Sequence, residues 1–312
     1  MSLIHPYFDI GGVDISHWQG PIDWGLLASK ASFAIIRSGD GIAGGSFDRQ
    51  WINNWSNAKG KLPRGAYWFY RTNVTPELQA QWVIKSYDAV GGDMGELGFY
   101  VDLELNDARL TMPAHTAHLN KFIALIDAYF AAHAPKTPLA GIYTSAGYWN
   151  GKIDPTKITA LDARPLWVAQ WPNLPSPRPT AIPTGWAHWD FWQFSAKGDG
   201  RAYLGPQAGR ALDMDVFHGS SAEFAQRFGL GTLPPPPVDN RLVVAFRPAR
   251  ANMNIRNKPS EIASVIIAKT MTEPLPVVGK TTDERGRIWY KLGASVAAEM
   301  WISATVGEAI YA

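Results

Sequence analysis

The sequence predicts an irregular, TIM-like β/α barrel over residues 1–230, followed by a small all-β barrel over residues 241–312. Three observations lead to this α/β fold class. Strand-like runs alternate with helical patterns up to residue 230, four consecutive prolines follow at 234–237, and only short β-like runs come after them. The 312 residues suffice for one barrel-sized domain and one small domain.

The strands of the barrel are expected at eight short runs that are rich in β-branched and aromatic residues and bounded by Gly, Pro or Asn. Eight strands with intervening helices are typical of a β/α barrel. The runs are Gly12–Ser16, Phe33–Ser38, Ala66–Tyr70, Phe99–Leu105, Leu139–Thr144, Leu166–Trp171, Phe191–Ser195 and Ala211–Phe217.

Helical patterns lie between several of these runs. Thr75-Pro76-Glu77 predicts a capped helix start, and Gly91-Gly92 predicts the end of that helix. The helical signal weakens after residue 150, so we expect loops between the last strands and an irregular barrel. A core-facing helical stripe is predicted at Leu119, Phe122, Ile123, Ile126 and Phe130.

The Pro-rich segment 231–240 is predicted to be a stiff linker, since consecutive prolines favour the extended polyproline II conformation. The β-like runs that follow it are punctuated by Pro, Gly, Asp and Asn and predict a small all-β barrel. They are Met253–Arg256, Val265–Ala268, Leu275–Val278, Trp289–Leu292 and Trp301–Ser303.

Composition excludes several classes of protein. The chain has no cysteine, so disulfides and thiolate metal sites are absent, and no apolar run is long enough to span a membrane. The net charge is +2, which implies no large nucleic-acid-binding surface. Residues 241–312 carry 10 Lys+Arg against 6 Asp+Glu, which suits either a weak preference for an anionic wall or an ordinary solvated surface. The first 12 residues do not form a secretory signal.

The strand expected at Phe99–Leu105 carries two carboxylates, Asp102 and Glu104. Because side chains alternate along a strand, both should point to one face about 6.5–7 Å apart, with Leu103 and Leu105 pointing the other way into an apolar layer. Each carboxylate raises the proton affinity of the other. A Glu that stays protonated near neutral pH can protonate the leaving oxygen of a glycoside. The simpler interpretation is a solvated or Arg-paired strand end.

Two further acids favour the catalytic interpretation. Asp14 ends the first predicted strand, and Asp213 is expected at the end of the eighth. First and eighth strands are neighbours in a closed barrel, so both acids can share one mouth with the fourth strand. The 14 Trp and 11 Tyr further indicate a groove in which aromatic faces stack on sugars, although buried core aromatics are the ordinary alternative.

Five segments together resemble the family 25 glycoside hydrolases, the Chalaropsis-type lysozymes. The likeness spans about residues 10–219 and implies an irregular β/α barrel that cleaves the β-1,4 bond between N-acetylmuramic acid and N-acetylglucosamine. The segments are Gly12–Gly20, Tyr100–Glu104, Pro165–Trp171, Trp192–Phe194 and Leu212–Phe217.

The resemblance also implies roles for individual residues. Glu104 would be the general acid, and Asp102 would orient or stabilise the 2-acetamido group of the substrate. Asp14 and Asp213 would complete the acidic cluster. Asp215 stands where the family often has Asn, which leaves open which of the two Asp side chains faces the cleft. The expected substrate-binding residues are Tyr67, Tyr143, Trp171, Gln193, Trp18 and Arg37, of which Arg37 could instead be structural.

Geometry narrows the mechanism only in part. An acid and a nucleophile must flank the scissile bond from opposite faces, which neighbours on one strand do not easily do. We therefore expect assistance by the substrate's acetamido group with net retention. The alternative is inversion, with Asp14 or Asp213 activating water.

Three other classes of protein share some of these features. A family 18 chitinase would need carboxylates near positions 97 and 100, where this chain has Leu97 and Tyr100. A non-enzymatic glycan-binding module would have no reason to keep the four acids. A metal hydrolase could use His115 and His118, but no third ligand is in register, and surface histidines near a helix start are the simpler interpretation. No metal or other cofactor is expected.

Residues 250–305 resemble a bacterial SH3-type domain through Met253–Ser260, Ile288–Leu292 and Met300–Ser303, with Met300 standing where that family usually has Gly. Such a domain would hold the enzyme on the wall and raise the local substrate concentration. The expected partner is bacterial peptidoglycan, acted on by a monomer without nucleic acid or membrane insertion. The combination suits a phage endolysin, or a secreted lysozyme whose signal has been removed.

Overall fold

The structure is a computed structural model that describes residues 5, 8–42, 46–172, 176, 178–231, 243–248, 253–256, 259, 265–269, 275–283, 287–292, 301–303 and 307–311. It divides into two compact units, the first running mainly from residue 8 to 237 and the second mainly from 238 onward. The predicted linker, apart from Gly231, lies outside the described residues, and so do Asn257, Lys258, Ser260 and Met300 of the SH3-like motifs.

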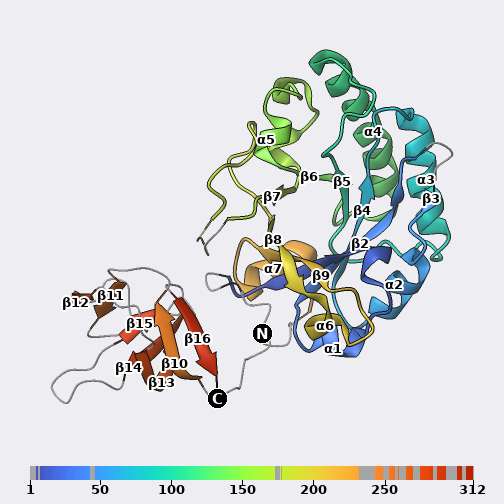
Figure 1. Ribbon diagram of the computed structural model, residues 1–312. Coiled ribbons are helices and arrows are strands. Elements are labelled where there is room, and N and C mark those ends of the chain that lie inside the picture. The colour runs from blue at the N-terminus through green and yellow to red at the C-terminus, as the bar shows by residue number, and fades with distance from the viewer. Residues whose placement is uncertain are drawn as a thin grey trace. The chain divides into compact units, whose positions relative to one another are not determined.

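The first unit is a closed barrel of eight strands (Figure 1). Closure occurs because β1 pairs with both β2 and β9, and β3 (Ser46–Phe47) adds a short antiparallel pair beside β2. Every strand predicted for this unit is present. The barrel strands are β1 (Gly11–Ile15), β2 (Phe33–Asp40), β4 (Arg64–Phe69), β5 (Phe99–Asp102), β6 (Gly141–Thr144), β7 (Leu166–Ala169), β8 (Phe191–Asp199) and β9 (Ala211–Phe217).

The last strand runs against the others. Among the eight barrel strands, all pairs from β1 to β8 are parallel, whereas β9 is antiparallel to both β8 and β1. Asp213 therefore lies near the start of its strand, whereas the sequence predicted it at the end. The reversal carries this start to the mouth of the barrel, by which we mean the end where the parallel strands finish.

Helices cover the outside of the first half of the barrel. In Figure 1, α3 and α4 lie side by side along β4 and β5, and α3 packs on α4 and β2. The hydroxyl of Thr75 accepts a hydrogen bond from the Leu78 amide, which confirms the predicted helix start. The helices are α1 (Trp24–Ala28), α2 (Trp51–Ala58), α3 (Pro76–Asp88), α4 (Met112–His133), α5 (Ala146–Trp149), α6 (Gly200–Leu204) and α7 (Ser221–Phe228), with 3-10 turns at His17–Gln19, Pro155–Lys157 and Leu161–Ala163.

The sequence patterns also located the core correctly. All five residues of the predicted stripe on α4 are fully buried. After β6 the helices shorten to one or two turns, so the barrel is irregular where the helical signal fades. One histidine of this helix departs from expectation, because His115 is fully buried and not at the surface.

Strand β5 ends at Asp102, three residues earlier than predicted. Leu103 is still buried and held by neighbours: its amide donates to the Tyr143 carbonyl, and its own carbonyl accepts from the Thr144 hydroxyl. Leu105 is exposed, so the expectation that it packs in an apolar layer is wrong. The chain has left the strand before this residue.

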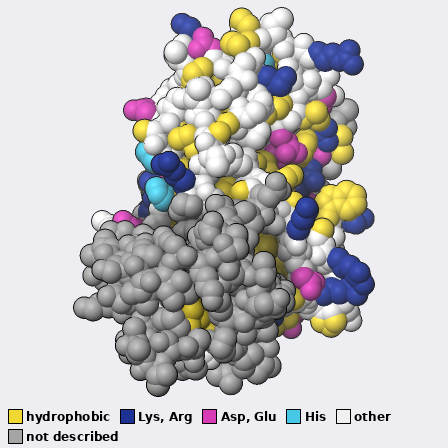
Figure 2. All heavy atoms as spheres, turned by 60° about the vertical axis from the view of Figure 1, so that its left-hand side comes forward, with side chains coloured by type: hydrophobic (Ala, Val, Ile, Leu, Met, Phe, Trp, Pro, Cys, Tyr) yellow, Lys and Arg dark blue, Asp and Glu magenta, His cyan; other side chains and the backbone are white. Residues whose placement is uncertain are grey.

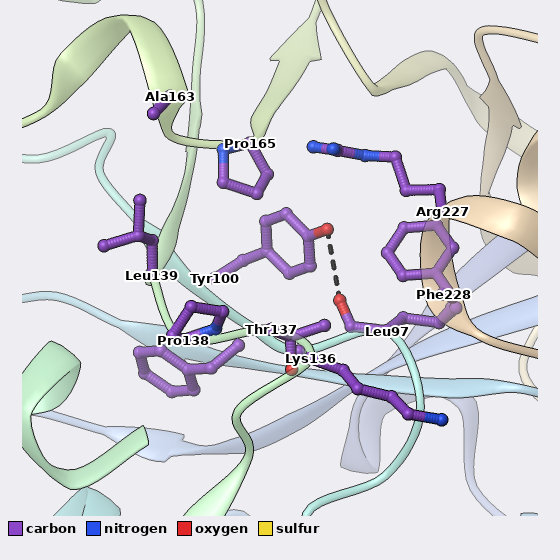
Figure 3. Close-up of a pocket in the computed structure, with 12 residues that line it drawn as sticks. Leu97, Tyr100, Lys136, Thr137, Pro138, Leu139, Ala163, Pro165, Arg227 and Phe228 are labelled. Atoms are coloured by element: carbon purple, nitrogen blue, oxygen red, sulfur yellow. Dashed lines mark hydrogen bonds between the residues drawn. The ribbon is translucent and has the colours of Figure 1, made fainter. Parts of the chain in front are cut away.

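The interior of the barrel is filled by aromatic side chains below the mouth. Trp167 lies edge-on to Tyr67 and tilted against Tyr143, with ring centroids 5.9 and 4.5 Å apart. At the opposite end, Tyr100 donates a hydrogen bond to the Leu97 carbonyl and borders a pocket of about 210 Å³ (Figure 3). The large rings exclude water from the barrel axis, so the mouth is backed by an apolar layer.

A buried cation anchors the outer side of β4. Arg64 is fully buried, and its guanidinium pairs with Asp93 at 3.0 Å and with Glu96 at 3.1 Å. It also lies 4.5 Å from the ring centroid of Trp55. This cluster ties β4 to the loop before β5 and has no contact with the mouth.

The second unit is an antiparallel sheet of seven strands in the order β12-β11-β15-β14-β13-β10-β16. All five strands predicted here are present, and β10 and β16 are additional. The Asp283 carboxylate accepts hydrogen bonds from Arg287 and from the Trp289 indole, which closes the β13–β14 turn. The strands are β10 (Val243–Pro248), β11 (Met253–Arg256), β12 (Val265–Lys269), β13 (Leu275–Thr282), β14 (Ile288–Leu292), β15 (Trp301–Ser303) and β16 (Gly307–Tyr311).

Candidate active site

A cleft of about 360 Å³ opens at the mouth of the barrel. It contains every residue predicted for the site, contributed by all eight barrel strands or the loops that follow them. The predicted residues that line it are Asp14, Trp18, Arg37, Tyr67, Asp102, Glu104, Tyr143, Trp171, Gln193 and Asp213. Further lining residues are Ser16, Gln19, Phe69, Trp167 and Ala196.

Backbone register brings two of the acids together. Asp14 of β1 stands directly opposite Asp213 of β9 in an antiparallel pair, which places their side chains on one face within a few ångströms. Burial, followed by the charges of neighbouring acids, raises the pKa of Asp14 well above its usual range. Burial and the charge on Glu104 raise the pKa of Asp213 to about 6. The mouth therefore holds protons that solvated carboxylates would release.

Asp102 and Glu104 face the same cleft from the end of β5. Asp102 is 6% exposed, and burial together with the charge on Glu104 raises its pKa well above the usual range. Glu104 is open to the cleft, yet loss of surrounding water still raises its pKa, against the opposing charges of Arg37 and Arg71. A Glu with a raised pKa and access to the cleft is suited to donate a proton.

Two arginines stand beside these carboxyls. Arg37 and Arg71 both bind Asp40, at 2.6 and 2.8 Å, and both lie over the Phe69 ring. Their positive charges lower the pKa of Asp102 and Glu104 and so oppose the effect of burial, although the described contacts include no ion pair with either carboxyl. The sequence had pointed to Arg37 alone.

Gln193 is the centre of a hydrogen-bond network on β8. Its amide nitrogen donates to Asp14 at 2.7 Å, while its amide oxygen accepts from the Tyr143 hydroxyl at 2.8 Å and from the Trp171 indole at 3.0 Å. Three strands are thereby linked, and the orientation of the Gln193 amide is fixed by its donors. One oxygen of Asp14 is committed to Gln193.

Two large aromatic side chains at the cleft are left in solvent. Trp18 is 71% exposed and Trp171 is 60% exposed, although both line the cleft. The His17 ring is tilted against the Trp18 ring, with centroids 4.5 Å apart, and its Nδ1 lies 2.6 Å from the Asp48 carboxylate. His17 therefore supports the indole and is not among the lining residues. Exposed tryptophans at a cleft offer apolar faces for sugar rings.

The two aspartates of β9 have different positions. Asp213 lines the cleft, whereas Asp215 is fully buried below it and accepts a hydrogen bond from the Trp167 indole at 2.8 Å. This answers the question that the sequence left open, since only Asp213 can meet a substrate directly.

The histidine pair of α4 does not form a metal centre. Within the part of the chain that the structure describes, no group of three His, Asp or Glu side chains could hold a metal ion. His118 bonds the Tyr70 hydroxyl, and the buried His115 ring faces Tyr148.

Among the described helices, none is both long and apolar enough to cross a membrane.

Basic side chains are spread over the visible described surface. Figure 2 shows Lys and Arg at separate places on this face and not gathered into one patch.

Sequence reasoning missed Asp40, Arg71 and Phe69, which flank the acids, and assigned no task to Asp215. Asp40 ends β2, and Arg71 follows β4 by two residues. Their position after barrel strands was a usable signal, because residues there reach the mouth.

A barrel with acids, oriented amides and exposed tryptophans at one mouth defines a glycan-cleaving enzyme. The model of the glycosyl hydrolases family 25 matches residues 13–201. Lysozyme M1 of Streptomyces globisporus is 30% identical over 217 residues, covering 68% of this chain and 69% of that protein.

Solved structures agree. The bacterial lysozyme from Streptomyces coelicolor matches with a TM-score of 0.54 and 28% identity, covering 71% of this chain and 98% of its own. The catalytic domain of endolysin ply40 from bacteriophage P40 of Listeria monocytogenes shares the fold, with a TM-score of 0.55, 20% identity, and coverage of 72% and 98%. The chain belongs to glycosyl hydrolase family 25 and is a glycoside hydrolase of the lysozyme type.

Proposed function

We propose that the enzyme is an N-acetylmuramidase that cleaves the β-1,4 bond between N-acetylmuramic acid and N-acetylglucosamine in bacterial peptidoglycan, with Glu104 as general acid. The observation that carries this assignment is the position of Glu104: it opens to the cleft beside buried acids, and loss of surrounding water raises its pKa. Of the four acids that line this cleft, it is the most accessible to a bound glycan.

The mechanism that fits best uses the substrate's own acetamido group. Asp102 and Glu104 come from one short segment and face the cleft together, so Asp102 is poorly placed to attack from the opposite side. A buried Asp102 with a raised pKa can instead accept a hydrogen bond from the acetamido N–H and orient its oxygen toward the anomeric carbon. Protonation of the leaving oxygen by Glu104 completes the step, with net retention.

Glu104→Gln tests the acid. The substitution removes the proton donor and keeps the shape, and loss of a general acid costs about 10²–10⁴-fold in rate. Clearing of a cell-wall suspension should stop while binding to the walls remains. Glu77→Gln, at an exposed position on α3, is the matched control and should clear walls normally. A fully active Glu104→Gln enzyme would contradict the assignment.

The anomer of the first product tests the mechanism. Retention gives the β-anomer first, whereas inversion by water activated at Asp14 or Asp213 gives the α-anomer. Proton NMR during the first minutes of digestion of a soluble glycan separates the two. Hydrolysis of chitin oligomers with no action on purified peptidoglycan would instead favour a chitinase-like enzyme.

We also propose that residues 241–312 form an SH3-type domain that retains the enzyme on the wall. The seven-stranded antiparallel sheet supports an all-β domain of this kind. Removal of residues 241–312 should weaken binding to intact walls more than it slows cleavage of soluble fragments, because only the former depends on attachment. Unchanged wall binding would refute the targeting role. The domain boundaries at 231–240 and a monomeric state belong to the same proposal.

A further inference from the structure

Asp215 is a buried carboxyl to which the reaction assigns no task. Its side chain is fully buried beneath the cleft, where one oxygen accepts a hydrogen bond from the Trp167 indole. Its other oxygen, Oδ2, receives no hydrogen from any described residue. A buried carboxylate oxygen without a donor is costly, so the neighbourhood should supply one.

The neighbour that can supply it is Asp14. Asp215 stands opposite Gly12 and Asp213 opposite Asp14 across β1 and β9, so the carboxyl groups of Asp14 and Asp215 are diagonal neighbours on one face, within reach of each other. Two ionised carboxylates in contact and out of water repel, and neither has a hydrogen to share. If one proton stays on the pair, the same contact becomes a hydrogen bond and the orphan oxygen is satisfied.

No charged group near the pair could take the place of the shared proton, as the groups on each surrounding strand show. From β9 itself comes Asp213, from β5 comes Asp102, and both are acids that add negative charge. The neutral neighbours are the Trp167 indole on β7, the Gln193 amide on β8 and the Tyr143 hydroxyl on β6. Arg37 on β2 acts instead on Asp102, Glu104 and Tyr67. Among the described groups facing Asp215, none is a cation.

We propose that Asp215 is a positioning residue: it shares one proton with Asp14, and this shared hydrogen bond, together with Gln193, fixes the Asp14 carboxyl at the floor of the cleft. The pair carries one negative charge and behaves as a dyad, with the proton lying between the two oxygens. Trp167 fixes Asp215, and Asp215 fixes Asp14, so the aromatic layer of the barrel sets the orientation of an acid that the substrate meets. This proposal rests on the proposed function only for its effect on catalysis.

A pH dependence follows from the shared proton. At high pH the dyad loses it, the hydrogen bond is replaced by repulsion, and Asp14 is displaced. The folded protein then also loses stability, because the unfolded chain released these protons at lower pH. Burial raises the pKa of Asp215 well above its usual range, which agrees with this direction. Stability from the dyad is thus present in acid and lost as pH rises through the folded pKa.

Asp215→Asn removes the titrating proton but keeps the shape of the side chain. The amide can accept from Trp167 and donate to Asp14, but it does not titrate. The melting temperature of Asp215→Asn minus that of wild type should rise by at least about 2 °C from pH 5 to pH 8.5. The kcat of the variant should also fall less than that of wild type on the alkaline side. Asp215→Leu has neither acceptor nor donor and should lose about 10- to 100-fold in kcat at every pH through displacement of Asp14.

The control and the two variants test the shared proton and the positioning of Asp14 separately. Asp88→Asn removes a charge at an exposed position on α3 and should follow wild type in both measurements. If Asp215→Asn and wild type show parallel melting-temperature profiles from pH 5 to 8.5, the shared proton is refuted. If Asp215→Leu matches Asp215→Asn in kcat, the positioning role is refuted. The melting profile needs no substrate, so it stands even if the muramidase assignment fails.

Discussion

Removing the charge of Asp213 should stabilise the enzyme at neutral and alkaline pH. Burial and the charge on Glu104 raise the pKa of this side chain to about 6, whereas an unfolded Asp titrates near the usual ~3.9. The folded state therefore binds a proton that the unfolded chain has already released, and the associated stability is complete below about pH 4 and lost as pH rises through about 6. Asp213→Asn has no such loss.

The size of the effect follows from that shift. A difference of about 2 between the pKa of Asp213 in the folded and in the unfolded chain corresponds to at most ~3 kcal/mol of unfolding free energy. Partial exposure of Asp213 to the cleft reduces this to about 1–2 kcal/mol. For a unit of this size, the expected gain in melting temperature is about 2–8 °C.

Thermal unfolding of wild type and Asp213→Asn, followed at half-unit steps from pH 4 to 8, measures the gain. The two curves should coincide at pH 4, separate between pH 4 and 7, and stay apart above pH 7. Asp88→Asn controls for the change in net charge. Equal or lower stability of Asp213→Asn at pH 8 would show that this carboxyl is not destabilised by its surroundings, and the account of the acidic cluster would fail.

Two other predictions concern the edges of the cleft and the outside of the barrel. Trp18→Ala and Trp171→Ala should each raise KM for soluble glycan several-fold with a smaller change in kcat, because both indoles are exposed stacking surfaces; a kcat loss at unchanged KM, measured by reducing-end release, would contradict a binding role. Arg64→Ala should destabilise the first unit by about 3–5 kcal/mol, since it leaves Asp93 and Glu96 without their buried cation. Urea unfolding measures the loss, and a loss under 1 kcal/mol would refute the anchoring role.

Much of the barrel could be predicted because local patterns and tertiary environment agree. The stripe from Leu119 to Phe130 is buried as its spacing requires, and Thr75 caps α3 as its motif requires. The site residues could be identified because each lies on a predicted barrel strand or soon after one, and the mouth gathers such positions.

The direction of β9 was not predictable with the boundaries available. With β8 ending at Ser195, enough chain precedes Ala211 for a parallel crossover. The strand in fact continues to Asp199, and the remaining connection, which contains only the short α6, is too brief for the dozen or more residues that a crossover needs. Strand length therefore decided topology, and it is the property that single-sequence patterns specify least.

The same limitation explains Leu105 and Asp215. Strand β5 ends at Asp102, and Leu105 lies beyond it, so the alternation of a strand no longer determines which way Leu105 faces. The task of Asp215 depends on an oxygen that lacks a donor and on contact with Asp14, which no local motif contains. Contacts between distant strands are visible only in three dimensions.

Mass spectrometry of peptidoglycan digests tests the central claim most directly. Wild-type enzyme should release muropeptides with new reducing-end N-acetylmuramic acid, and Glu104→Gln should release none above background. Reducing-end N-acetylglucosamine, or freed stem peptides with intact glycan, would contradict a muramidase that uses Glu104 as its acid.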